Sequence, residues 1–226
     1  MQTEAVWRAL PRKIREVLAE KDLHDLQEIR LRSGQPLLLK RENRLFSLGK
    51  EGVFLPAADE KGMRISMADL RETVSLLSGY SLYAFEEELR QGYLTIEGGH
   101  RVGFCGKAVL ENGEIRTLRQ INALNIRIAR ERKGWGETLL PLLLEKNTLC
   151  HTLLVSPPGC GKTTLLRDLI RCLSERGKTV GVVDERGEIA PLRDGMPQMD
   201  VGPCTDILEG CPKAKGMTLL LRSMSP

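Results

Sequence analysis

One run of residues, LLVSPPGCGKTTLL at positions 153–166, constrains the fold of this chain more than any other feature. It places an apolar segment, a loop of small residues, a Lys-Thr pair and a second apolar segment in that order. This order is typical of a loop between a buried strand and a helix, where backbone N–H groups at the positive helix end hold a phosphate. The sequence therefore predicts a P-loop that binds ATP with Mg²⁺.

The spacing gives each side chain of the loop a predicted role. Lys162 is expected to reach the β- and γ-phosphates, and the Thr163 hydroxyl to bind Mg²⁺. Ser156 stands where the pattern G-x-x-x-x-G-K-[ST] begins with glycine, and a small serine suits the end of a strand. The residues expected to line the nucleotide are Ser156, Pro157, Pro158, Gly159, Cys160, Gly161, Lys162, Thr163 and Thr164.

The segments around the loop favour a nucleotide site over a chance Gly-Lys-Thr at the start of a helix. Residues 149–156 are an uncharged apolar run, which predicts a strand buried on both faces of a parallel sheet. A second apolar strand, residues 179–183, follows Gly177 and leads into Asp184 and Glu185. Between them, a helical stripe is formed by Leu165, Leu166, Leu169, Ile170 and Leu173.

Length and composition set the domain organisation. The chain has 226 residues, and Gly134 and Gly136 mark a linker. The predicted fold is α/β: a smaller α+β domain over residues 1–134, then an apparently truncated P-loop NTPase core of the RecA/AAA-like type over residues 135–226. With 41% hydrophobic and 28% charged residues, no secretory leader and six scattered cysteines, the composition is typical of a reduced, cytoplasmic globular protein.

The N-terminal domain is predicted to combine helices with a largely antiparallel sheet. Helices are expected over residues 3–20, from Ser66 to Gly79 with Asp69 completing a capping box, and again up to Gly92. Residues 41–65 give no clear pattern beyond short hairpins. Strands are expected over residues 26–32, 37–40, 100–110, 114–118 and 124–130, with Asn112-Gly113 forming a hairpin turn.

Basic residues are concentrated in one part of this domain. Residues 100–133 contain eight Lys and Arg but three Asp and Glu. Such a segment can meet nucleic acid, a membrane surface or a bound phosphate, or can form a solvated sheet face. Stacking aromatics are not interleaved with the basic residues, so no nucleic acid is expected as a partner, although a nucleic-acid-binding NTPase stays an alternative. The alternation places Arg101 and Arg127 on one polar sheet face.

Five separated motifs carry a family resemblance. They are GGHRVG at 98–103, LNIRIAR at 124–130, SPPGCGKTT at 156–164, VDER at 183–186 and LRSMSP at 221–226. Together the motifs resemble the stage III sporulation protein AA family over essentially the whole chain. The resemblance implies a mother-cell ATPase similar to those of type II and type IV secretion systems. It further implies a homo-oligomeric, hexameric ring at the inner membrane face, working with membrane proteins of a channel complex between mother cell and forespore.

The resemblance also implies roles for single residues. Gly159 to Thr164 would hold the nucleotide, and Asp184 and Glu185 would form an acidic box that positions Mg²⁺ and water. Glu185, with Lys162, is the predicted catalytic residue, and Glu188 is the alternative acid. The residues expected to approach the nucleotide across a subunit boundary, as arginine fingers do, are Arg101 and Arg127.

The chain departs from the family pattern at its end. In the family, a hydrophobic strand ending in Asp-Glu follows the Arg-Ser-Met-Ser-Pro stretch, whereas this sequence stops at Pro226. We therefore expect a truncated chain in which nucleotide binding survives and efficient hydrolysis does not. A ring subunit that uses nucleotide only to hold its interfaces is a further alternative.

Overall fold

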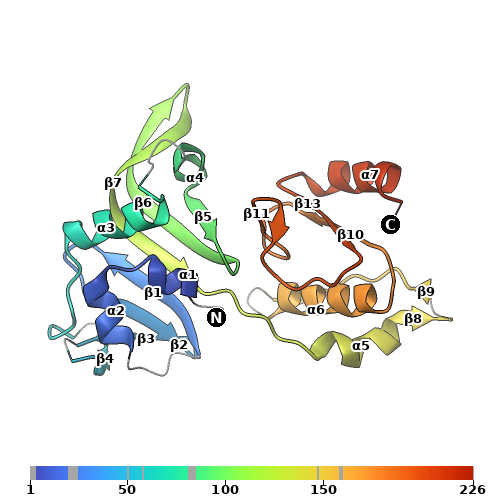
Figure 1. Ribbon diagram of the computed structural model, residues 1–226, viewed down its shortest axis with the longest axis horizontal. Helices are drawn as coiled ribbons and strands as arrows, with labels where there is room; N and C mark the ends of the chain where they lie inside the picture. Colours follow the sequence, from blue (N-terminus) through green and yellow to red (C-terminus); the bar gives the residue numbers. More distant parts are fainter. Residues whose placement is uncertain are drawn as a thin grey trace. The chain divides into compact units, whose positions relative to one another are not determined.

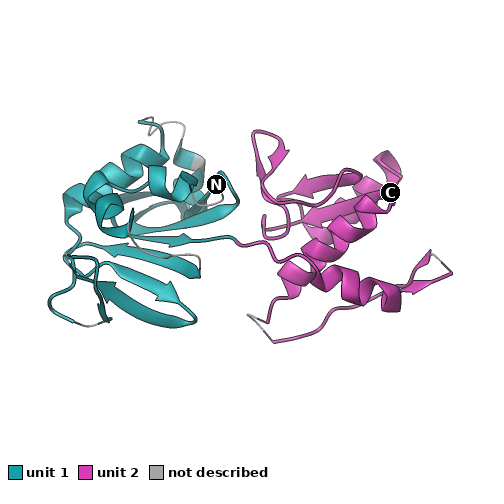
Figure 2. Cartoon of the chain, turned by 60° about the horizontal axis from the view of Figure 1, so that its bottom comes forward, with its two compact units in different colours: residues 1–129 teal, residues 130–226 magenta. Residues whose placement is uncertain are grey.

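In the computed structural model the chain divides into two compact units, residues 1–129 and residues 130–226 (Figure 2). The second unit begins at Arg130, four residues before the predicted linker at Gly134, and a functional boundary at residue 134 stays a prediction. The structure describes residues 4–19, 25–49, 51–57, 59–80, 85–146, 148–157 and 160–225.

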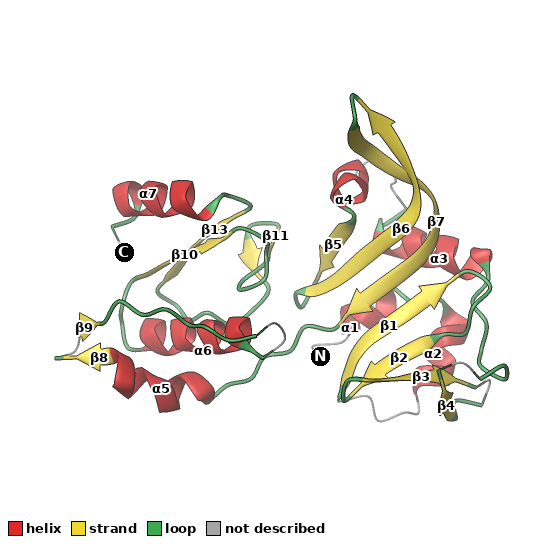
Figure 3. Cartoon of the chain, turned by 180° about the vertical axis from the view of Figure 1, so that it is seen from behind, coloured by secondary structure: helices red, strands yellow, loops and turns green. Residues whose placement is uncertain are grey.

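Unit 1 is built on a seven-stranded antiparallel sheet with the strand order β4-β3-β2-β1-β7-β6-β5. Four helices accompany it: α1 (Glu4–Arg8), α2 (Arg12–Ala19), α3 (Met67–Leu77) and α4 (Glu86–Gln91). Views from opposite sides place α1, α2 and α3 on the same face of the sheet (Figures 1 and 3). The strands are β1 (Leu26–Arg32), β2 (Leu38–Arg41), β3 (Arg44–Leu48), β4 (Phe54–Pro56), β5 (Tyr93–Ile96), β6 (His100–Glu111) and β7 (Glu114–Arg127).

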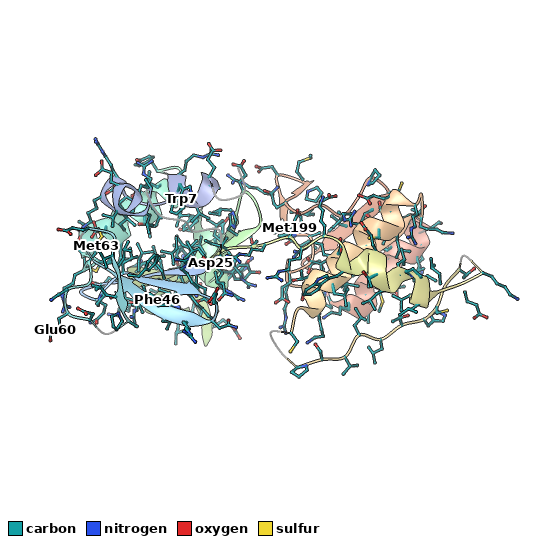
Figure 4. The ribbon with its side chains drawn as sticks, turned by 90° about the horizontal axis from the view of Figure 1, so that it is seen from below. Trp7, Asp25, Phe46, Glu60, Met63 and Met199 are labelled. Carbon is teal, nitrogen blue, oxygen red and sulfur yellow. The ribbon has the colours of Figure 1, made fainter. Side chains whose placement is uncertain are left out.

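The core of unit 1 lies between the helices and the sheet. Val102 and Ile126 point into it from paired positions of β6 and β7, and Ile14 and Leu70 enter from α2 and α3. Trp7 of α1 packs against its margin and is half-buried (Figure 4). Because side chains alternate along a strand, residues next to the core positions face the opposite side, where no described helix covers them.

Local sequence signals explain where the elements of unit 1 begin and turn. The capping box of α3 is confirmed, because Ser66 Oγ accepts the Asp69 N–H and the Asp69 carboxylate accepts the Ser66 N–H. The hairpin turn at Asn112 and Gly113 is also confirmed, with φ of 53° and 82°, as a type I′ turn requires. The structure adds two strands, β3 and β4, within residues 41–65.

Two expected elements of unit 1 differ in the structure. The single helix over residues 3–20 is divided into α1 and α2, because Pro11 cannot continue a helix from the preceding turn. The two expected strands after Gly113 form one strand, β7, which ends at Arg127. A bulge accommodates the bend in β7: Gln120 has φ of 48° opposite Gly106, where an added Cβ would lie 2.6 Å from the Arg119 carbonyl oxygen.

Unit 2 has a layered α/β arrangement. Its central pair of parallel strands, β10 (Val180–Asp184) and β13 (Thr205–Glu209), has α6 (Lys162–Glu175) on one face and α7 (Lys213–Ser223) on the other (Figure 1). Helix α5 (Trp135–Leu143) packs on the far side of α6, around Leu140, Leu169 and Cys172. Two short hairpins complete the unit: β8 (Leu144–Glu145) with β9 (Thr148–Leu149), and β11 (Leu192–Arg193) with β12 (Met196–Pro197).

The predicted buried strand over residues 149–156 is wrong. Only Leu149 belongs to a strand, and residues 150–157 have no regular secondary structure. Leu153 and Val155 are 85% and 81% exposed, and Leu154 alone packs against a described core. An apolar run becomes a buried strand only where neighbouring strands accept its backbone hydrogen bonds, and no described strand pairs with residues 150–156.

The expected helix after the loop and the second strand are confirmed, whereas Leu166 of the predicted apolar stripe is exposed. Helix α6 begins at Lys162 and ends before Gly177, which has φ of 74°, and β10 ends at Asp184. Within the described part of the chain, no helix combines the length and hydropathy that crossing a membrane requires.

The capping box generates a first prediction. Ser66→Ala removes the acceptor for the Asp69 N–H, so we expect the free energy of unfolding of unit 1 to fall by about 1 kcal/mol. Urea unfolding followed through Trp7 fluorescence, in a Trp135→Phe background, measures this value. Glu72→Ala, an exposed change in the same helix, is the control, and an equal loss in both variants would contradict the capping role.

Asp69 also makes this stability depend on pH. Its burial opposes ionisation, but hydrogen bonds from Lys13, at 2.6 Å, and from Ser66 outweigh that effect and lower the pKa of Asp69. A depressed folded-state pKa stabilises the fold above the unfolded pKa of about 4, and this contribution is lost as the pH falls through the folded pKa. We expect Asp69→Asn to destabilise unit 1 at neutral pH and progressively less in acid, as measured by urea midpoints. A difference that is constant with pH would contradict this.

Candidate functional site

The candidate site lies in unit 2, where a long loop leads from β9 to the start of α6 (Figure 3). Ser156, Pro157, Cys160 and Gly161 belong to its described part. The two remaining predicted loop residues, Pro158 and Gly159, lie outside the described residues.

The Lys162 side chain folds back onto the loop. Its Nζ donates to the Ser156 carbonyl oxygen at 2.7 Å, to the Ser156 hydroxyl at 3.3 Å and to the Pro157 carbonyl oxygen at 3.0 Å. The structure therefore brings together two predicted residues that are six positions apart. Ser156 does more than replace a glycine at this position, because its hydroxyl supplies an oxygen to the lysine that glycine lacks.

The first turn of α6 begins at a residue that cannot cap it. Gly161 has φ of 83° and no side chain to accept N–H groups from Lys162, Thr163 or Thr164. Unsatisfied N–H groups and the helix dipole make such an end favourable for an anion. Thr163 and Thr164 are half-buried in this turn, whereas Cys160 is exposed. The arrangement can hold a phosphate between the helix end and the Lys162 ammonium.

Asp184 ends β10 and is buried. Its carboxylate accepts the backbone N–H of Glu188 at 2.9 Å, Ile189 at 2.8 Å and Ala190 at 2.9 Å. The side chain predicted to bind metal thus holds the backbone of residues 188–190, in the segment that follows β10. Its role as a metal ligand stays a prediction. Among the described residues, no group of three or more His, Cys, Asp and Glu side chains is arranged to hold a metal ion.

The two acids proposed to position water are both exposed. Glu185 Oε2 lies 3.0 Å from the Nζ of Lys213, the first residue of α7, and this partner lowers the pKa of Glu185. Glu188 is exposed, and its backbone carbonyl accepts a hydrogen bond from Arg167 at 2.8 Å. Glu185 and Glu188 both lie in the loop that follows Asp184 at the end of β10.

Glu209 is an acid at this edge that sequence reasoning missed. It ends β13 directly opposite Asp184 in the parallel register, so both carboxylates lie at the carboxyl edge of the strand pair. Burial and the neighbouring Asp184 raise the pKa of Glu209, although its hydrogen bond from the Leu192 N–H, at 3.0 Å, acts in the opposite direction. The run TDILE at 205–209, in which an apolar pair precedes an acid, could have indicated a strand that ends in Glu209.

Arg167 is a second residue at this site that the sequence pattern did not indicate. Its guanidinium is buried beneath the acid-bearing loop and donates to the backbone carbonyls of Glu188, Ile189 and Arg130. Burial lowers the pKa of Arg167, and the charge of Asp184 acts against that shift. Arg167 thereby ties the loop after β10 to the helix that begins at Lys162.

The two predicted arginine fingers lie in unit 1. Arg101 and Arg127 stand directly opposite each other on β6 and β7, so their side chains project from the sheet face away from the core, as the alternation indicated. The Arg101 guanidinium lies 3.6 Å from the centre of the Tyr93 ring, and Arg127 is exposed and faces Glu28 of β1. Their approach to a nucleotide stays a prediction.

The first comparison with known proteins concerns sequence. The family model described as "Sporulation stage III, protein AA" matches residues 1–226. Stage III sporulation protein AA of Bacillus subtilis (strain 168) is 42% identical to this chain, and the matched region covers 96% of this chain and 69% of that protein.

The second comparison concerns solved structures. The pilus retraction motor PilT with bound ADP has a TM-score of 0.50 at 16% identity, covering 94% of this chain and 57% of that one. The Legionella pneumophila ATPase DotB has a TM-score of 0.44 at 16% identity, covering 94% of this chain and 58% of that one. The chain therefore spans less than two thirds of these solved chains. The likeness to PilT supports a mixed α/β fold of the P-loop NTPase type.

The buried hydrogen bonds of Asp184 lead to a third prediction. Asp184→Ala leaves three backbone donors without an acceptor, so we expect the free energy of unfolding of unit 2 to fall by about 3 kcal/mol in the absence of Mg²⁺. Urea unfolding followed through Trp135, in a Trp7→Phe background, measures the loss. Glu185→Ala is the matched control and should have little effect because its ion pair is exposed. Equal stabilities for the two variants would contradict the structural role of Asp184.

Proposed function

Because this chain belongs to the stage III sporulation protein AA family, we propose that it is an ATP-binding and ATP-hydrolysing subunit of a sporulation secretion or channel complex. The observation that carries the proposal is the Lys162 ammonium, which three oxygens of Ser156 and Pro157 hold at the uncapped start of α6. Lysine is a rotatable point charge with three donors, so a phosphate can replace these oxygens without rebuilding the helix. The PilT structure, which shares the fold, contains ADP.

The oxygen groups of Thr163 and Asp184 fit a Mg²⁺–nucleotide. Thr163 offers a hydroxyl in the first turn of α6, the position at which P-loops bind the metal. A carboxylate has about four lone-pair sites, and Asp184 uses three of them for backbone N–H groups, which leaves one for the metal or its water. When bound, the metal would supply charge neutralisation on the β- and γ-phosphates.

Catalysis would then be mainly electrostatic. Lys162 and the N–H groups of the loop would stabilise charge on the γ-phosphate, and Glu185 would orient the attacking water, with Glu188 as the alternative. Glu185 must first leave Lys213, which is feasible because the pair is exposed to solvent. The adjacent Arg167 would act indirectly, by holding the loop that carries both acids.

Arg101 and Arg127 offer two positive charges for assembly with other subunits. We infer a homo-oligomeric, hexameric ring in which Arg101 and Arg127 meet the nucleotide of a neighbouring subunit. The support is electrostatic: like charges directly opposite on adjacent strands repel, so an anion between them would be stabilising. The ring would work in the mother-cell cytoplasm, at the inner face of the membrane, with membrane proteins of the channel complex.

The central experiment measures ATP binding and phosphate release for the chain and for Lys162→Ala. Loss of a charge-assisted contact predicts a Kd that is about 10- to 100-fold higher in the variant. Lys215→Ala, an exposed lysine on α7, is the matched control and should bind as the parent does. Binding that is equal in the parent and in Lys162→Ala would overturn the nucleotide site.

A second candidate function is a scaffold that binds nucleotide without turning it over. The specific observation favouring it is that both acids are engaged, Asp184 by backbone N–H groups and Glu185 by Lys213. Sedimentation velocity with and without a non-hydrolysable ATP analogue tests it. Analogue-dependent oligomers without phosphate release would support the scaffold, whereas Lys162-dependent phosphate release would support the ATPase.

A further inference from the structure

A tryptophan lies beside the phosphate loop and is not used by the function proposed above. Trp135 begins α5, and its ring is 3.4 Å from the point where a Cβ on Gly161 would lie. The residue is 46% exposed, whereas tryptophans are highly buried on average. Since Gly161 directly precedes Lys162, the indole borders the start of the predicted phosphate site.

The backbone that carries this ring is held firmly. The N–H of the next residue, Gly136, donates to Asp168 Oδ2 at 2.7 Å, and a Cβ at Gly136 would lie 2.7 Å from the Asp168 backbone. Asp168 is buried and paired with Arg171 at 2.8 Å. Helix α5 is thus docked on α6 through backbone contact, so the indole is exposed at a defined position and does not serve as the anchor.

A cation accompanies the indole. The Arg132 guanidinium lies 5.7 Å from the centre of the Trp135 ring, close to the outer limit for cation–π attraction, so it is held weakly and can be displaced. Arg132 also lines a small hollow together with Thr164, in the first turn of α6. The indole and the guanidinium therefore flank the same turn that is predicted to hold the phosphates.

We propose that Trp135 and Arg132 form the nucleoside-recognition part of the site, in which the base stacks on the exposed indole and the Arg132 guanidinium packs against the bound nucleoside. Both a rigid aromatic face and a planar guanidinium stack on bases. This inference rests on the proposed nucleotide site and adds the group that distinguishes a nucleotide from a bare phosphate chain. A ring that only supports Gly161 would affect both ligands alike.

The test compares Mg²⁺–ATP with Mg²⁺–tripolyphosphate by isothermal titration calorimetry on the 226-residue chain. We expect Trp135→Ala to raise the Kd for ATP about tenfold and to leave the Kd for tripolyphosphate unchanged. Trp135→Phe keeps an aromatic face and should retain most of the ATP affinity, which guards against misfolding of the alanine variant. Arg132→Ala removes a positive charge beside the same turn, so it should weaken both ligands and weaken ATP more than tripolyphosphate. Leu142→Ala, a 78% exposed change on the same helix, is the control.

Fluorescence gives a second readout. In a Trp7→Phe background Trp135 is the single tryptophan, and ATP should change its emission while tripolyphosphate does not. Equal weakening of both ligands in Trp135→Ala, or of neither, would overturn nucleoside recognition and leave the proposed phosphate site standing. A parent chain that binds neither ligand would overturn the proposed function, and this inference with it.

Discussion

Helix α6 is held in unit 2 by buried charge as well as by apolar packing, and the other elements of the unit take their places from it. Arg167, Asp168 and Arg171 are each less than 9% exposed, although they lie in the middle of the helix. Charge buried in this way is tolerable only when it is paired and hydrogen-bonded. Arg167 donates to a backbone carbonyl of the loop after β10, and Asp168 accepts a backbone N–H at the start of α5. Arg171 forms ion pairs with acids that include Glu137 and Glu175.

The residues of α6 that hold neighbouring elements lie after its first turn. Arg167 holds the acid-bearing loop, Asp168 docks α5, and Ser174 accepts the Cys204 N–H at 2.6 Å, which fixes the approach to β13. The pairing lowers the pKa of Asp168 and raises that of Arg171, in each case against the effect of burial, so both stay charged. The start of the helix, at Lys162, has no side-chain cap and is therefore the part of α6 that can bind a ligand.

Much of this organisation could be predicted from the sequence, because its signals are local. The start of α6, the Ser66 capping box and the turn at Asn112 each depend on a few neighbouring residues. Features set by distant partners could not be predicted. Residues 150–156 of the apolar run have no described strand to pair with, and Glu209 lies beside Asp184, which is 25 residues earlier in the sequence. The buried Arg167 resembles any helical arginine until the carbonyls that it contacts are known.

A crystal structure of the chain with Mg²⁺ and a non-hydrolysable ATP analogue would test the nucleotide site directly. We expect the Lys162 ammonium to leave the Ser156 and Pro157 carbonyl oxygens for the phosphates, while Asp184 keeps its three hydrogen bonds from backbone N–H groups. An analogue bound away from the start of α6, with Lys162 still on its own loop, would contradict it.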